Sequence, residues 1–140
     1  MIKQNKQPTM KKIIILFGIL LTVFSCDKSD DKQIDTDLIG KWALIEVLAD
    51  PGDGSGTFHP VQSNKIVEFH TDGTITSNGT ICDMSIEANE TTSGTYSLVD
   101  STISPADCNY PMKIKFEHSV SLLILYYPCF EPCRIKYEKR

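Results

Sequence analysis

The sequence has no apolar run long enough to cross a membrane. The longest run, residues 13–24, has 12 residues and includes Gly18 and Thr22. As a helix it would be about 18 Å long, whereas the hydrocarbon core of a bilayer is about 30 Å thick. We therefore expect no transmembrane helix.

The sequence also lacks the residue patterns of common active sites. No serine stands in a G-x-S-x-G pattern, and His59, His70 and His118 do not have the spacing of metal ligands. Residues 50–56 are rich in oxygen ligands and glycine, as calcium-binding loops are, but they lack the spacing and the closing glutamate of an EF-hand. A mobile loop is the other interpretation of this segment. We predict a protein that is not an enzyme and uses no cofactor or metal.

A convincing helical period is absent from residue 37 onward. Short alternating runs separated by turn signals predict an all-β fold. Asp72-Gly73 and Asn78-Gly79 are typical hairpin turns. The expected strands are 41–48, 65–70, 74–77, 80–82, 94–99, 102–104, 112–117, 122–127 and 134–138. About eight strands joined mainly by hairpins favour a small up-and-down antiparallel β-barrel.

The N-terminus, residues 1–25, has the pattern of a secretory signal. Four lysines and no acidic residue accompany the short apolar run. The sequence Val23-Phe24-Ser25-Cys26 resembles the lipobox of bacterial lipoproteins. This resemblance implies cleavage before Cys26 and acylation of that cysteine, and several acyl chains make a stable anchor. An ordinary signal peptide followed by a chance cysteine is the alternative.

Residues 26–36 are charged and almost free of apolar side chains, so we expect a flexible acidic tether. Their acidic cluster resembles the export signal of surface lipoproteins in Bacteroidetes-type bacteria, although a solvated spacer would look the same. The expected location is the outer membrane, on its periplasmic face or at the cell surface. After cleavage, ten basic and 18 acidic side chains remain, a formal net charge of −8. This charge argues against nucleic acid as a partner.

Four cysteines remain in the domain that we expect over residues 37–140. An even number in an exported chain predicts two disulfides, for which three connectivities are possible. Cys129 and Cys133 flank a short turn, so we predict that they pair and that Cys82 pairs with Cys108. A four-cysteine zinc site is the alternative, although the spacing lacks paired CxxC motifs.

A family resemblance covers residues 38–140. Leu38-Ile39-Gly40-Lys41-Trp42 matches the G-x-W opening of the lipocalins. The segment 69–74, Gly94-Thr95-Tyr96 and the closing Tyr137 are similar to small lipocalin-like lipoproteins of Bacteroidetes. The resemblance implies a calycin-type β-barrel with Trp42 packed across its closed end. The chain departs from the lipocalins in its small domain and its four cysteines.

Two binding functions follow from these patterns. The leading hypothesis is a membrane-anchored module that takes a small apolar ligand in the barrel interior or mouth. The alternative is a protein-interaction or inhibitor module that uses loops 50–60 and the turn 129–133 on a filled barrel. Glu46 has the inward parity of Trp42, although a wet position at the barrel mouth is the other interpretation. We expect a monomer. The candidate ligand-contacting residues are Trp42, Glu46, Phe69, Tyr96, Phe116 and Tyr127.

Overall fold

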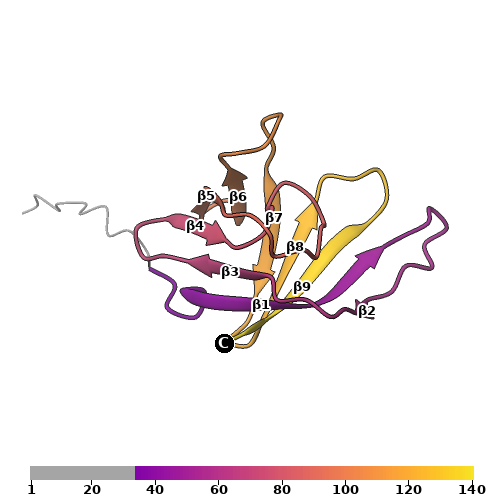
Figure 1. The fold of residues 1–140 in the computed structure, drawn as a ribbon, viewed down its shortest axis with the longest axis horizontal. Helices are drawn as coiled ribbons and strands as arrows, with labels where there is room; N and C mark the ends of the chain where they lie inside the picture. The colour runs from indigo at the N-terminus through magenta and orange to yellow at the C-terminus, as the bar shows by residue number, and fades with distance from the viewer. Residues whose placement is uncertain (1–33) are drawn as a thin grey trace, which may run out of the picture. The chain divides into compact units, whose positions relative to one another are not determined.

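The computed structural model describes residues 34–140, in which all regular elements are β-strands (Figure 1). These residues include no helix that is long and apolar enough to span a bilayer. The predicted signal peptide, Cys26 and residues up to 33 lie outside the described residues. The strands are β1 (Gly40–Ala49), β2 (His59–Pro60), β3 (Ile66–Phe69), β4 (Thr74–Ser77), β5 (Thr92–Ser97), β6 (Thr102–Pro105), β7 (Ile114–His118), β8 (Leu122–Tyr127) and β9 (Cys133–Lys139).

The strands close into an antiparallel barrel. From β3 to β9 each strand pairs with the next, and β1 pairs with both β3 and β9. The short β2 pairs with β1 beyond the end of β3, through Glu46↔Pro60 and Val47↔His59. β2 and β3 therefore share one position in a closed barrel of eight strands. The predicted all-β, up-and-down barrel is confirmed.

Because successive strands run in opposite directions, the connections between them lie alternately at the two ends of the barrel. We call one the entry end, because the described chain begins there; it includes residues 34–39 and the turns 70–73, 98–101 and 119–121. We call the other the loop end, and it includes the connections 50–58, 78–91, 106–113 and 128–132. Lys139, near the C-terminus, lies at the entry end opposite Trp42.

Alternating side chains explain the barrel core. Along β7, Ile114 and Phe116 are buried whereas Lys115 and Glu117 are exposed. Similar alternation along the other strands points one face of the sheet inward. The core side chains are Leu38, Trp42, Leu44, Val67, Phe69, Ile75, Ile81, Ile103, Ile114, Phe116, Leu123, Leu125, Tyr127, Ile135 and Tyr137.

One predicted hairpin turn is confirmed and the other is wrong. Asp72 accepts a hydrogen bond from the Thr74 backbone N–H at 2.9 Å, and Gly73 has the positive φ of 89° that the tight turn requires. Asn78 instead caps the edge of β3, where its side chain accepts from the Ile66 N–H at 2.8 Å. β4 ends at Ser77 without a tight turn, and the chain continues into the long connection 78–91. Residues 80–82, predicted as a strand, belong to that connection.

Two disulfides link the loop-end connections. Cys82 pairs with Cys108 across 26 residues, and Cys129 pairs with Cys133 across four. The first joins connection 78–91 to connection 106–113, and the second closes the turn between β8 and β9. The predicted connectivity is confirmed.

Residues 35–39 form the turn that leads into β1. The backbone carbonyl of Asp35 accepts from the N–H groups of Leu38 and Ile39, and its side chain accepts from the N–H of Asp37 at 3.0 Å. Asp35 was expected in the tether because the segment around it is charged. In the structure it shapes the turn that leads into β1.

Candidate functional site

The aromatic residues predicted to contact a ligand belong to the hydrophobic core or pack against it. Trp42 is 0%, Phe69 1% and Phe116 3% exposed. The Phe69 ring lies edge-on to Tyr96 and to Phe116, with centroid distances of 5.1 and 5.8 Å. Tyr127 is buried as well, and the hydroxyl of Tyr96 donates to the carbonyl of His70 at 2.7 Å. These side chains therefore contact other parts of the chain across the barrel interior.

Glu46 lies on the outside of the barrel, contrary to its inward parity. The register between β1 and β9 shifts between Leu44 and Glu46, so Ile45 forms a β-bulge. The extra residue reverses the alternation, because Leu44 faces Tyr137 whereas Glu46 faces Lys136. Glu46 and Lys136 form an ion pair on the outer surface. Glu46 is therefore not an interior ligand residue.

Connection 78–91 covers the barrel interior at the loop end. Ile81 is 1% exposed and belongs to the core. The hydroxyl of Ser77 accepts from the Gly79 N–H at 3.1 Å, and that of Thr92 donates to the Gly79 carbonyl at 2.8 Å. The Ser63 hydroxyl donates to the carbonyl of Ile86 at 2.6 Å. The connection is thus fastened to the ends of β4 and β5 and to the segment before β3, in addition to its disulfide.

Lys65 is a buried lysine beneath this connection. It shares inward parity with Val67 and Phe69 and is 0% exposed. Its Nζ donates to the Ser85 carbonyl at 2.6 Å. Burial lowers the pKa of Lys65 to about 8, although the carboxylates of Asp83 and Glu90 oppose the shift. Lys65 therefore anchors connection 78–91 through a charge whose burial is costly. Its position two residues before Val67 was the sequence signal that the Lys65 side chain points inward.

Two tyrosines in the same barrel interior are buried without a hydrogen bond. The hydroxyls of Tyr127 and Tyr137 have no partner among the described residues. Burial raises the pKa of both phenols well above the usual value, and the Asp83 carboxylate raises that of Tyr127 further. Both phenols therefore stay neutral at physiological pH.

The connection between β1 and β2 is held by two of its own carboxylates. Asp50 accepts from the backbone N–H groups of Gly52 at 2.7 Å, Gly54 at 3.1 Å and Gly56 at 2.7 Å. These bonds, with that from Gly56 the largest, lower the pKa of Asp50. Asp53 accepts from the Ser55 N–H at 2.9 Å. Within residues 34–140, no group of three or more His, Cys, Asp or Glu side chains could hold a metal ion.

A braced turn next to this connection presents an exposed aromatic ring. Phe130 lies between Cys129 and Cys133 and is fully exposed. The carbonyl of Pro132 accepts from the N–H of Asp50 at 3.1 Å, which joins the turn to the connection 50–58 (Figure 1). The cysteine spacing indicated the turn but did not single out Phe130, whose position inside the disulfide ring was the available signal.

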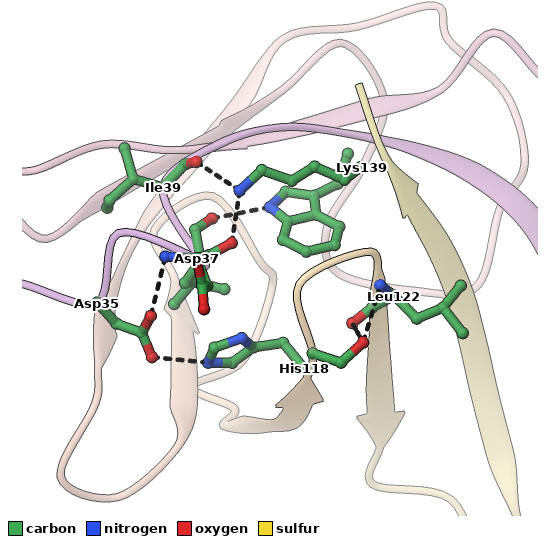
Figure 2. A network of polar contacts seen from close by, with 9 residues as sticks. Asp35, Asp37, Ile39, His118, Leu122 and Lys139 are labelled. Atoms are coloured by element: carbon green, nitrogen blue, oxygen red, sulfur yellow. Dashed lines mark hydrogen bonds and ion pairs between the residues drawn. The ribbon is translucent and has the colours of Figure 1, made fainter.

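The entry end carries a polar network that includes Asp37, Ile39 and Lys139 (Figure 2). The indole N–H of Trp42 donates to the Leu38 carbonyl at 2.8 Å. Lys139 Nζ lies 4.5 Å from the centre of the Trp42 ring and donates to the Ile39 carbonyl at 2.6 Å and to the Asp37 carbonyl. These contacts fold residues 35–39 over the buried ring. Trp42 therefore lies where the lipocalin resemblance implies, at a covered end of the barrel.

Two clefts lined by described residues lie outside the core. One, of about 370 Å³, lies between residues 62–64 and 86–88. The other, of about 270 Å³, is lined by outer residues of β1, β3 and β4 and by neighbouring residues. Neither is lined by any of the six predicted ligand-contacting residues. These clefts give the predicted apolar-ligand site no further support.

Comparison with known proteins assigns no function to the chain. No protein-family model and no curated protein matches it. Among solved structures, it is similar to a DUF4847 family protein from Bacteroides vulgatus, with 14% sequence identity and a TM-score of 0.45. The match covers 75% of this chain and 95% of that one.

Proposed function

We propose that the protein is a membrane-anchored, non-catalytic module that binds a protein partner through its loop end. The observation that carries this proposal is the contrast between the two sides of the barrel wall. Inside, Trp42, Phe69 and Phe116 are buried in the core, and the Phe69 and Phe116 rings lie edge to face. Outside, Phe130 stands fully exposed on a turn closed by a disulfide.

Packing of the core favours this proposal over an internal apolar ligand. A ligand of that kind needs a cavity of roughly 300 Å³ or more lined by apolar side chains. The aromatic residues expected to line it occupy the interior themselves, and connection 78–91 covers it with Ile81. The internal ligand stays a prediction, and it requires an opening of this packed core.

The bracing of Phe130 is suited to binding. A disulfide holds its turn, and the Asp50–Pro132 hydrogen bond fixes that turn to the neighbouring connection. A side chain that is already held loses less conformational entropy when it enters a partner's pocket. Exposed aromatic residues in such positions are frequent binding hot spots. Phe130 is therefore the proposed anchor residue.

The charge of the loop end indicates the chemistry of the partner. The four loop-end connections carry seven acidic side chains and a single basic one, Lys113. Opposite charges across an interface accelerate association and exclude like-charged competitors. We therefore propose a partner with a basic surface around an apolar pocket. The acidic residues are Asp50, Asp53, Asp83, Glu87, Glu90, Asp107 and Glu131.

Photo-crosslinking from two positions tests the binding surface. A crosslinking amino acid replaces Phe130 at the loop end or, as the control, Val99, which is 96% exposed at the entry end. We expect a discrete protein adduct from position 130 only. The purified partner should then bind the Phe130→Ala variant at least tenfold more weakly, since a hot-spot truncation costs about 2 kcal/mol or more. Equal adducts from both positions, or unchanged affinity, would refute the proposal.

Membrane anchoring through Cys26 is a separate part of the proposal. It rests on the lysine-rich signal and on the similarity of residues 23–26 to a lipobox. We propose the outer membrane, on its periplasmic face or at the cell surface. Cys26→Ala should release the protein from membranes and remove the mass of the acyl chains. If membrane partition and mass stay unchanged in that variant, the protein is not anchored at Cys26.

A further inference from the structure

The entry end gathers exposed apolar side chains. Six large apolar residues are exposed within residues 34–140, and four of them belong to this end. Isolated exposed apolar residues are ordinary, whereas a group at one place indicates a contact surface. The four are Ile34 at 52%, Val99 at 96%, Val120 at 69% and Leu122 at 41% exposure.

Backbone and side-chain contacts join the three segments that carry these residues. The carbonyl of Ser101, two residues after Val99, accepts from the N–H of Phe116 in β7 at 2.9 Å. At the end of β7, Nε2 of His118 lies 3.1 Å from the carboxylate of Asp35, the neighbour of Ile34 (Figure 2). Val120 and Leu122 follow in the turn from β7 to β8. The four residues thus lie in segments that contact β7 or directly follow it.

The proposed anchor ties this same end to the membrane. Between Cys26 and Ile34 the chain advances eight residues, and fully extended it spans at most about 29 Å. The tether joins the barrel at the entry end, since Ile34 belongs to the group of exposed apolar residues. The length and attachment point of this segment therefore favour lipid as the occupant of the apolar surface.

We propose that the entry end rests on the lipid bilayer, with Ile34, Val99, Val120 and Leu122 in contact with its interfacial region. This inference rests on the proposed anchoring at Cys26. The entry end carries both acidic and basic side chains, among them Asp35, Asp100, Lys139 and Arg140. Apolar contact therefore drives the docking, without a requirement for anionic lipid. The orientation leaves Phe130 and the other loop-end residues directed away from the membrane.

Fluorescence quenching by brominated lipid tests this orientation. The full lipidated protein is reconstituted into phosphatidylcholine vesicles, with a tryptophan introduced by Val120→Trp or, as the matched control, by Phe130→Trp. Wild-type protein supplies the signal of Trp42, which is common to all samples. We expect the added fluorescence at position 120 to be quenched at least threefold more than that at position 130.

Three outcomes distinguish the proposed docking of the entry end from the proposed anchoring at Cys26. Strong quenching at position 120 alone, with the acyl mass present, supports the docked orientation. Equal or absent quenching at both positions, with the acyl mass present, overturns the docking and leaves the anchoring intact. A protein that lacks the acyl mass overturns the anchoring at Cys26 and the docking that rests on it. Val120→Ser, measured as a second variant at wild-type stability, should weaken protection of amides 119–122 from hydrogen exchange on vesicles.

Discussion

Asp35 Oδ2 lies 3.1 Å from Nε2 of His118 and joins the segment before β1 to the end of β7. His118→Ala removes this contact. We expect the unfolding free energy to fall by about 1 kcal/mol and the amides of residues 34–39 to exchange faster. Chemical denaturation and hydrogen exchange measure the two effects. His59→Ala is the control, because His59 is exposed and its side chain lies 3.4 Å from the hydroxyl of its near neighbour Thr57. Equal effects of the two substitutions would contradict the structural role of His118.

The buried Lys65 predicts a rise of stability with pH. Its pKa is about 8 in the folded protein and 10.5 ordinarily. Between these values the unfolded chain holds a proton that the folded chain has released, so the unfolding free energy increases as pH rises. From pH 7.5 to 9.5 we expect a gain of about 2 kcal/mol from this residue. Below pH 8 both states hold the proton, and the cost of burying the charge is fully present.

Urea denaturation of the Lys65→Met variant checks the assignment of this pH dependence. The variant should lack the gain between pH 7.5 and 9.5, even if the loss of the bond to the Ser85 carbonyl lowers its stability at every pH. Lys113→Met, at an exposed position of the loop end, is the control and should keep the gain. If wild type and Lys65→Met show the same slope, another group is responsible.

The unpartnered tyrosine hydroxyls predict an unusual response to substitution. Tyr127→Phe and Tyr137→Phe each remove a buried hydroxyl that has no hydrogen-bond partner within residues 34–140. We expect unchanged or higher stability, by up to about 1 kcal/mol, because a costly buried polar group disappears. Tyr96→Phe is the matched control and should lose about 1 kcal/mol, since Tyr96 donates to the His70 carbonyl. A loss in all three variants would show that Tyr127 and Tyr137 are also bonded.

The two disulfides should differ in their contribution to stability. Loop entropy predicts a loss of roughly 3.5 kcal/mol for the Cys82→Ser, Cys108→Ser double variant and roughly 2 kcal/mol for Cys129→Ser, Cys133→Ser. The separations of 26 and four residues set this order. Denaturation of both double variants measures it. The reverse order would show that the short disulfide has a larger role than closing its own turn.

The barrel was predictable because its strands alternate clearly. Ile114 and Phe116 alternate with charged residues, and that alternation alone assigns the inner and outer faces of β7. The same argument failed at Glu46. A bulge at Ile45 adds one residue to β1, and a period of two carries no sign of such an insertion.

Long-range contacts account for the other differences. Asn78-Gly79 has the composition of a hairpin, yet the Asn78 side chain bonds to the backbone of β3, which only the fold brings within reach. Asp35 was assigned to the tether by its charge, whereas its partner His118 lies far along the chain. The disulfide pairs were predictable because short separation favoured Cys129–Cys133 and left a single further pair.

Native mass spectrometry of the purified full-length protein tests most directly whether the barrel holds a ligand in its interior. The packing of Phe69, Phe116 and Tyr96 predicts a mass equal to the mature chain with its two disulfides and the proposed acyl anchor, with no further bound molecule. Tyr127→Phe, which leaves the packing in place, should give the same result. An apolar molecule bound in one-to-one ratio and released on unfolding would contradict the filled interior and restore the internal-ligand hypothesis.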